Sequence, residues 1–322
     1  MSKYILYGHD GSNNHGCEAL VRSTVMLLED LCNDITLIST APEEDEYYHL
    51  NQLCKIIKRG ECGQVNRNSL AFLRAYSDLK LRKNSWAMDA IHIGRGANIH
   101  KNDIALSIGG DSYCYGTINQ QQLINEHNIW KYNGLKTVLW GCSIEPKLLE
   151  DEDMAEDIRQ FDLITVRESI SYEAIKKINP HTVLVSDSAF MLRKKELPLP
   201  ESFMGCDLVG INTSPMIEEN EYSTGLAREN YEKLIEYILT KTQMKVLLIP
   251  HVVWNFSDDR KVLNELYKKY ADTGRIYCIE NQNCENLKGF ISRCRFFCRC
   301  QNACNDCSVF LLYSDCSGWL FG

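Results

Sequence analysis

The chain has 322 residues, of which 44% are hydrophobic and 24% are charged, values that are typical of a soluble globular protein. This length suits two domains better than one compact core. Acidic residues outnumber basic ones by 43 to 35, and the resulting net charge of −8 argues against a nucleic-acid binder, which normally carries a basic face. No segment has the pattern of a signal peptide or a transmembrane helix, so we expect a cytoplasmic protein.

The first 195 residues alternate short aliphatic runs with amphipathic helical patterns. The predicted strands are Tyr4–Tyr7, Ile35–Ser39, Ile104–Ile108, Thr137–Trp140, Leu163–Val166 and Thr182–Val185. The predicted helices are Cys17–Leu31, Gln120–Asn133, Glu152–Phe161 and Ile170–Ile178. Such alternation predicts a parallel sheet with helices on both faces, which is a Rossmann-like, doubly wound domain.

A charged, proline-bearing stretch at 193–200 predicts a linker, and a second α/β series then occupies 205–297. Its predicted strands are Leu208–Asn212, Lys245–Pro250 and Arg275–Ile279, and its predicted helices are Arg228–Lys241 and Asp259–Tyr270. We therefore expect two Rossmann-like domains that face a cleft. Ligands of such sheets bind beyond the carboxyl ends of the strands, so the loops there are the places to search.

The loop after the first strand, Gly8–Ala19, is rich in glycine and polar residues. Glycines between a strand and a helix expose backbone N–H groups that suit a phosphate or a carboxylate. Asn14, Gly16 and Glu18 are the candidate binding residues in this loop. It has neither a Walker A pattern nor a clean dinucleotide fingerprint, so a tight turn without a ligand remains an equal alternative.

Another loop, Gly109-Gly110-Asp111, follows the predicted strand Ile104–Ile108. Two glycines clear space beside a carboxylate, and Asp111 could accept a proton from an attacking hydroxyl or hold a sugar. The alternative is an Asx turn or a helix cap. Gly109 and Gly110 are candidate binding residues and Asp111 is a candidate catalytic residue.

Arg167 and Glu168 follow the strand Leu163–Val166. An arginine at a strand end offers a fixed, bidentate donor for a carboxylate or a phosphate, and the alternative is an ion pair with Glu168 or another acid. Arg167 is therefore a candidate catalytic residue, and Glu168 a candidate binding residue. Asp187, after the next strand, fits a structural role as well as a functional one.

Three polar residues end strands of the second domain. Asn212 and Ser214 follow its first strand, and His251 follows its second. We expect all three at one rim of the sheet, as candidate substrate-binding residues. For His251, a structural hydrogen bond is the alternative to a catalytic role.

The chain resembles the polysaccharide pyruvyl transferase family. The matching segments extend over nearly everything up to Phe297, and their order makes the combination specific. They are Asn14-His15-Gly16-Cys17-Glu18-Ala19, Gly109-Gly110-Asp111, Val166-Arg167-Glu168-Ser169, Ser186-Asp187-Ser188-Ala189-Phe190, Gly210-Ile211-Asn212 and His251-Val252.

The resemblance implies a glycosyltransferase-B-like fold and transfer of pyruvyl from phosphoenolpyruvate to a sugar, usually as a ketal. The acceptor would be a saccharide or a lipid-linked saccharide of an exopolysaccharide, capsule or cell-wall polymer, which makes peripheral membrane association an expectation. Arg167 matches the donor-binding arginine, and Asp111 matches an acidic residue near the sugar or donor. The chemistry requires no metal and no cofactor. Acceptor, linkage and oligomeric state are not specified by the sequence.

The family also has an Arg-x-His segment in the second domain, which supplies a second donor-binding arginine and the general acid. This chain reaches the expected strand at Ser292–Phe297, but no Arg-x-His follows. Instead, 5 of its 15 cysteines fall in residues 298–322. A zinc or iron–sulfur site is one interpretation of this tail, but a second Cys-x-x-Cys at a standard interval is missing.

A frameshift after Phe297 explains the tail better. With suitable synonymous bases, the codons from Cys298 onward, displaced by one base, spell Val-Gly-Ala-Arg-Thr-His-Ala-Thr-Ile-Ala-Ala-Tyr. Gln301 then becomes Arg and Ala303 becomes His, which restores the missing motif. We therefore expect an incomplete second domain and an impaired enzyme. The alternatives are a glycosyltransferase that uses a nucleotide sugar, a non-catalytic remnant, and a metal-binding protein that acts through the tail.

Overall fold

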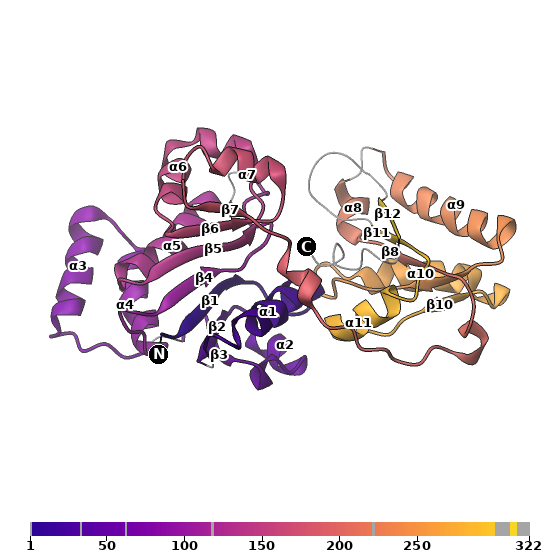
Figure 1. Cartoon of the computed structure of the whole chain (residues 1–322), viewed down its shortest axis with the longest axis horizontal. Helices are drawn as coiled ribbons and strands as arrows, with labels where there is room; N and C mark the ends of the chain where they lie inside the picture. Colours follow the sequence, from indigo (N-terminus) through magenta and orange to yellow (C-terminus); the bar gives the residue numbers. More distant parts are fainter. Residues whose placement is uncertain are drawn as a thin grey trace. The chain divides into compact units, whose positions relative to one another are not determined.

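The computed structural model describes residues 2–32, 34–61, 63–116, 119–220 and 223–299, and the strand at 310–313. The chain divides into two compact units, each with its own sheet (Figure 1). Unit 1 holds residues 1–12 and 20–188, and unit 2 holds 13–19 and 189–322. The mixed α/β architecture with two parallel-stranded units confirms the predicted fold class.

Unit 1 contains a seven-stranded sheet of order β3-β2-β1-β4-β5-β6-β7 in which all neighbouring strands are parallel. The strands are β1 (Tyr4–His9), β2 (Ile35–Ser39), β3 (Lys55–Lys58), β4 (Ile104–Ser107), β5 (Lys136–Cys142), β6 (Leu163–Val166) and β7 (Thr182–Leu184). The strand order reverses between β1 and β4, which makes their carboxyl ends the topological switch point of this sheet.

Helices cover both faces of this sheet. The helices of unit 1 are α1 (His15–Leu28), α2 (Pro42–Tyr47), α3 (Leu70–Arg82), α4 (Trp86–Gly96), α5 (Gln120–Tyr132), α6 (Glu152–Arg159) and α7 (Ser169–Ile175), of which α3 packs on α4 and not on the sheet. Alternate residues of β1 show the two faces: Leu6 packs with Val21 and Val25 of α1, whereas Ile5 packs with Ala90 of α4 and Ile129 of α5. Short 3-10 turns lie at Leu50–Gln52, Pro146–Glu150 and Ser188–Met191.

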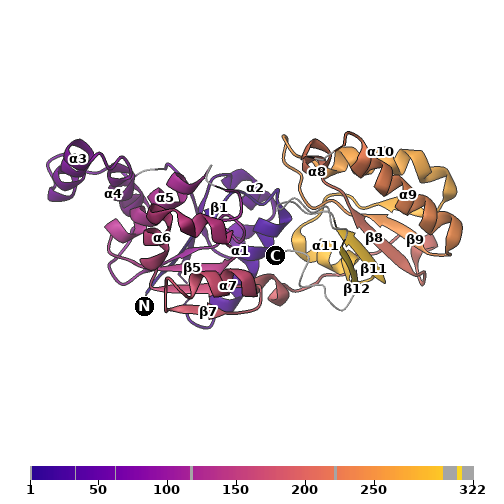
Figure 2. The ribbon, with the colours of Figure 1, turned by 90° about the horizontal axis from the view of Figure 1, so that it is seen from above.

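Unit 2 contains a five-stranded sheet of order β10-β9-β8-β11-β12 (Figure 2). Its parallel strands are β8 (Leu208–Asn212), β9 (Lys245–Leu248), β10 (Ile276–Cys278) and β11 (Phe296–Arg299), and β12 (Phe310–Tyr313) pairs antiparallel with β11. The helices are α8 (Pro215–Asn220), α9 (Leu226–Lys241), α10 (Asp259–Tyr270) and α11 (Cys284–Ile291), with 3-10 turns at Glu201–Phe203 and Ala271–Thr273. Here the strand order reverses between β8 and β11.

The two faces of the second sheet have different cover. Val209 and Ile211 of β8 pack with α9 and α10, through residues such as Ile235 and Leu263. Leu208 packs on the other face with α11 and with the segment that enters from unit 1. Gly210 lies where a Cβ would be 2.6 Å from Phe297, so the close approach of β8 and β11 requires glycine there.

The division between the units falls at Ser188, before the expected boundary at residue 195. Lys288 of α11 explains the difference. Its buried ammonium group donates to the carbonyl oxygens of Ala189, Phe190 and Leu192, at 3.2, 3.2 and 2.8 Å. The segment that the sequence presents as a charged linker is therefore bound to unit 2, in whose core Leu192 and Leu199 are buried. The tail at 298–322 lies mostly outside the described residues.

Candidate functional site

Polar loops gather at the carboxyl ends of four adjacent strands in unit 1. Gly109–Asp111 follow β4, Ser143 follows β5, Arg167 follows β6 and Asp187 lies beyond β7. Parallel strands end at one edge of a sheet, so these loops share one rim. The backbone connects them further, because Ser143 N donates to Gly110 O at 2.8 Å.

Arg167 is held by two of these loops. Its Nε donates to Ser143 Oγ at 2.9 Å, and its Nη1 donates to Asp187 Oδ2 at 2.9 Å. The arginine side chain is 13% exposed and the aspartate side chain 8%. Two bonds on different nitrogens fix the plane of the guanidinium group, and Nη2 makes no hydrogen bond to the residues that the structure describes. A guanidinium group fixed in this way can bind a carboxylate or a phosphate.

Gly110 makes room for this arginine. Its φ is +56°, and a Cβ there would lie 3.3 Å from Arg167 Nη1 and 3.1 Å from Leu20 Cδ1. Gly109 is constrained as well, since its Cβ would meet Ser112 Oγ. Asp111 is partly buried, and its Oδ2 accepts a hydrogen bond from Tyr115 at 2.8 Å. The two glycines thus shape the rim, and Asp111 presents a carboxylate there.

Glu168 has a structural task. Its carboxylate caps α7 by accepting from Ile170 N at 2.7 Å and from Ser171 N at 2.8 Å. Asp187, and not Glu168, is therefore the acid that pairs with Arg167.

In unit 2, the loop before α1 is tied to the start of α11. Asn14 Oδ1 accepts from Gly16 N at 2.9 Å, which fixes the turn. His15 Nδ1 donates to Glu18 Oε2 at 2.9 Å, and the same oxygen accepts from Cys284 N at 2.9 Å. Both His15 and Glu18 are fully buried. Glu18 therefore binds protein groups in this structure, and its carboxylate is enclosed.

Asp259 organises the rim of the second sheet. Its Oδ2 accepts from Asn212 Nδ2, His251 N and Val252 N, each at 2.9 Å. The other oxygen, Oδ1, has no hydrogen-bond partner among the described residues. Burial raises the pKa of Asp259 to about 6, although the three hydrogen bonds act against this rise. One buried carboxylate thus joins the carboxyl ends of β8 and β9 to the start of α10.

His251 contacts Arg299 at the same rim. Arg299 Nη2 lies 3.1 Å from His251 Nε2, and because a guanidinium group can only donate, Nε2 is the acceptor. Burial, the charge of Arg299 and the nearby His15 lower the pKa of His251 well below its usual value. His251 is therefore neutral at pH 7, with its proton on Nδ1.

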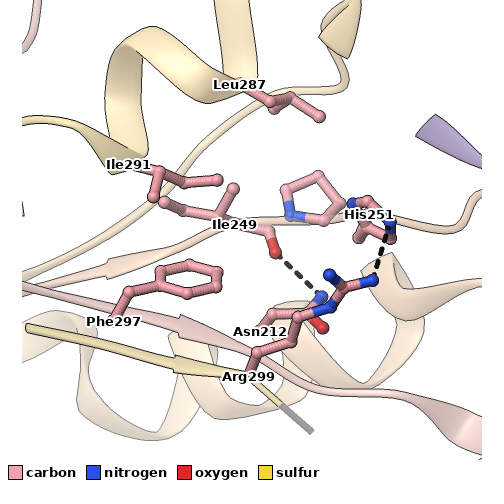
Figure 3. A pocket seen from close by; sticks show the side chains of 8 residues that line it. Asn212, Ile249, His251, Leu287, Ile291, Phe297 and Arg299 are labelled. Atoms are coloured by element: carbon pink, nitrogen blue, oxygen red, sulfur yellow. Dashed lines mark hydrogen bonds between the residues drawn. The ribbon is translucent and has the colours of Figure 1, made fainter. Parts of the chain in front are cut away.

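A small pocket opens at this point (Figure 3). Asn212 and Arg299 are paired across β8 and β11 at the switch point of the sheet, and both line the pocket with His251. Leu287 and Ile291 of α11 and Phe297 form its apolar wall. The empty volume, including the part open to solvent, is about 220 Å³. The site suits a small polar or anionic group that contacts Asn212, His251 and Arg299.

The sequence prediction brought Asn212 and His251 to one rim, and the structure places them there. Ser214 lies apart from the pocket lining, and its carbonyl oxygen accepts from Ile217 N at 3.1 Å at the start of α8. Asp259 and Arg299 are not among the site residues predicted from the sequence, because Asp259 stands as the first residue of a predicted helix and Arg299 belongs to the tail. Among the described residues, no group of three or more His, Cys, Asp or Glu side chains is arranged to hold a metal ion.

Two Rossmann-like units with polar loops at the carboxyl ends of their parallel strands define a glycosyltransferase-B-like fold. A model of the polysaccharide pyruvyl transferase family matches residues 14–298. The chain belongs to the polysaccharide pyruvyl transferase family. No curated protein matches it by sequence. Family and fold together indicate a transferase-type enzyme.

Solved structures resemble the fold at low sequence identity. A UDP-N-acetylglucosamine 2-epimerase from Listeria monocytogenes has a TM-score of 0.55 and 10% identity, with 92% of this chain and 74% of that chain covered. MnaA of S. aureus, solved with UDP, has a TM-score of 0.55 and 12% identity, with coverage of 92% and 73%. HepE of Anabaena, in complex with UDP, has a TM-score of 0.53 and 10% identity, with coverage of 94% and 75%. These similarities establish the fold alone.

Proposed function

We propose that this chain derives from an enzyme that transfers the pyruvyl group of phosphoenolpyruvate to a sugar of an exopolysaccharide, capsule or cell-wall polymer. The observation that carries this proposal is the fixed guanidinium group of Arg167. Ser143 and Asp187 orient it, and Gly110 leaves the space that it occupies. Phosphoenolpyruvate carries both a carboxylate and a phosphate, and either group can accept two parallel hydrogen bonds from a guanidinium group.

The reaction needs three functions from the protein. A cation must stabilise the charge on the donor, an acid must protonate the methylene carbon, and a base must help the sugar hydroxyl to attack. We assign the first function to Arg167 and the third to Asp111, whose carboxylate lies on the same rim of unit 1. The second belongs to the family's Arg-x-His segment, which this chain lacks. The reaction assigned here requires neither a metal nor a cofactor.

Asn212 and His251 are proposed to contact the substrate in unit 2. The pocket that they line supports this assignment, because it lies at the switch point where ligands of such sheets bind. His251 fits a hydrogen-bonding role better than a general-acid role, since its lowered pKa leaves the imidazole neutral near pH 7. Glu18, Asn14 and Gly16 would act by shaping the loop.

We further propose that residues from Cys298 onward are translated out of frame. The match to the family model ends at residue 298, which supports a departure at this point. Arg299 stands where the displaced frame would give glycine, and its guanidinium group lies in the pocket against His251. Such a chain should transfer pyruvyl poorly. The gene sequence tests the idea, because synonymous bases that do not spell Arg-Thr-His at codons 301–303 in the displaced frame would refute it.

A glycosyltransferase that uses a nucleotide sugar is the second candidate, supported by neighbours that were solved with UDP. Ligand-induced stabilisation separates the two: phosphoenolpyruvate should raise the melting temperature of the purified chain, whereas UDP should not. A larger effect of UDP would favour the second candidate. We place the protein in the cytoplasm, where phosphoenolpyruvate is available, with access to a lipid-linked acceptor.

A further inference from the structure

Helix α3 has apolar side chains on two sides. On the inner side, Ala75 is buried and packs with Ala87 and Ile91 of α4. On the outer side, four large side chains face solvent: Leu70, Leu73, Tyr76 and Leu81 are 85, 55, 47 and 81% exposed. We call these four residues the α3 outer face. A helix that buries one apolar side and exposes another usually has a second partner for the exposed side.

The outer face is continuous along the helix. Successive residues of an α-helix turn by about 100°, so Leu70, Leu73 and Leu81 fall within roughly one quarter of the circumference, with Tyr76 beside Leu73. Both views show α3 at the outer end of unit 1, where α4 separates it from the sheet (Figures 1 and 2). The face is therefore accessible along the full length of the helix.

Basic residues surround this face in a chain that is acidic as a whole. Residues 64–84 contain five basic residues and one acidic residue, whereas the net charge of the chain is −8. The one acid, Asp78, is buried on the inner side, where its Oδ2 accepts from Tyr132 at 2.8 Å. Arg74 borders the outer face beside Leu81, with its Nε 4.0 Å from Asp78 Oδ2, and it is exposed. Lys80 is exposed within the face, between Leu73 and Tyr76, and its Nζ lies 5.7 Å from the centroid of the Tyr76 ring. Arg67 and Lys83 are exposed at its ends.

We propose that the α3 outer face binds the surface of a membrane that contains anionic lipids, with the helix axis parallel to the bilayer plane. A row of leucines and a tyrosine bordered by Lys and Arg is the pattern of an interfacial helix, in which the apolar side chains enter the acyl boundary and the cations meet lipid phosphates. This surface is separate from the loops that carry Asp111 and Arg167, and the proposal does not depend on the proposed function.

A second copy of the chain fits this face less well. Two α3 helices packed together would bring the cations of both copies close to each other, and the one acid of the segment, Asp78, already pairs with Arg74 and Arg82 of its own copy. Three turns of helix with four apolar side chains also offer far less than the about 800 Å² per partner that stable interfaces bury. An anionic surface instead attracts the same cations and needs no shape complementarity.

Co-sedimentation of the full chain with vesicles tests the proposal. One set of vesicles contains phosphatidylglycerol and phosphatidylcholine in equal parts, and the other contains phosphatidylcholine alone. The variants are L70Q/L73Q/L81Q for the apolar side chains and R67Q/K80Q for the charges. A matched control, L31Q/L53Q/I170Q, replaces exposed apolar residues elsewhere in unit 1, at 66, 42 and 68% exposure. All these side chains are exposed, so circular dichroism should show unchanged folding.

The proposal predicts binding of the unaltered chain and of the control to the anionic vesicles. The partition coefficient of L70Q/L73Q/L81Q should fall by about tenfold or more. That of R67Q/K80Q should fall by about fivefold for each charge removed, and only on the anionic vesicles. Binding of L70Q/L73Q/L81Q within twofold of the unaltered chain, or an equal loss in the control, would overturn the proposal. So would light scattering that shows a dimer without vesicles, if L70Q/L73Q/L81Q dissociates it.

Discussion

Arg299 donates a hydrogen bond from Nη2 to Nε2 of His251 at 3.1 Å, and this contact lies within the pocket at the switch point of the second sheet. The arginine is 7% exposed, so its charge lies against an imidazole that it helps to keep neutral. If the segment after Phe297 is out of frame, this arginine is not a residue of the ancestral site. The pocket then contains the guanidinium group of Arg299 at a position where the displaced frame encodes glycine.

Arg167 should control binding of the donor. Substitution by lysine keeps the charge but loses the planar, bidentate donor and the bond from Nε to Ser143. We expect R167K to weaken binding of phosphoenolpyruvate by about tenfold, the effect of losing one charge-assisted hydrogen bond. Isothermal titration measures this. The control R159K alters a surface arginine that pairs with Glu152 and Glu156, and it should bind phosphoenolpyruvate like the unaltered chain. Equal affinities of R167K and R159K would contradict the assignment.

A substitution of Gly110 should affect both backbone strain and the position of Arg167. Alanine at this position would be strained by the positive φ. It would also displace Arg167 or Leu20, since its Cβ would lie 3.3 Å from Arg167 Nη1 and 3.1 Å from Leu20 Cδ1. The control G134A has the same backbone problem at φ +77°, but the nearest described atom would be Lys101 Cγ at 3.9 Å. Each variant should lose about 1 kcal/mol of stability from strain. Only G110A should also lose affinity for phosphoenolpyruvate. An equal loss of affinity in G134A would mean that the loss does not come from displacement of Arg167.

Glu18 should act through structure. Its Oε2 accepts from His15 Nδ1 and from Cys284 N, and all its contacts are enclosed. E18A leaves both donors buried without an acceptor and should lower the free energy of unfolding by about 2–4 kcal/mol. E18Q can keep one oxygen in the same position, so its loss should be clearly smaller. Urea denaturation measures both, and equal stability of E18A and the unaltered chain would indicate that the carboxylate serves a ligand instead.

The raised pKa of Asp259 should make the stability of the fold depend on pH. Its pKa is about 6 in the folded protein and near 3.8 when unfolded, so the folded state binds the proton more tightly. Its contribution to stability is therefore present in full below pH 3.8 and is lost as the pH rises through 6. This difference corresponds to about 3 kcal/mol. The stability of the unaltered chain relative to D259N should thus rise by that order between pH 7 and pH 4.

The neighbouring Asp258 gives a control of opposite sign. Burial acts to raise its pKa, but hydrogen bonds from Arg260 outweigh this effect and lower it. Its stabilising effect is present above pH 3.8 and is lost as the pH falls below it. The stability of the unaltered chain relative to D258N should therefore not rise on acidification. Chemical denaturation at several pH values would reveal whether the two substitutions behave alike, which would contradict the assignment.

The regular alternation of elements made much of the fold predictable. The bounds of β2, β6, β8 and α10 agree with the prediction, and an aspartate directly precedes each of these elements (Asp34, Asp162, Asp207 and Asp258). Helices α3 and α4 were not predicted. In α3, apolar residues lie on both sides of the helix, with Leu70, Leu73 and Leu81 outside and Phe72 and Ala75 inside, so its pattern lacks a single apolar stripe. The edge strand β3, with two lysines and two isoleucines, is too short to give a clear alternation.

The placement of polar residues at the carboxyl ends of the strands was predictable, but their hydrogen-bond and ion-pair partners were not. The sequence placed Arg167, Asp187, Asn212 and His251 at strand ends. It could not show that Asp187 rather than Glu168 pairs with Arg167, because both acids stand near a strand end. Nor could it show that Asp259, at a predicted helix start, reaches back to β8 and β9. Such contacts join residues far apart in the chain and depend on the packing of α10.

The most direct test compares phosphoenolpyruvate and UDP as ligands of two chains, the unaltered one and the variant R299G/Q301R/A303H. The variant installs the three residues that the displaced frame would give at these positions. The proposed function predicts that phosphoenolpyruvate, and not UDP, raises the melting temperature of the variant, with an affinity about tenfold above that of the unaltered chain. Stabilisation of both chains by UDP, with no effect of phosphoenolpyruvate on either, would contradict it.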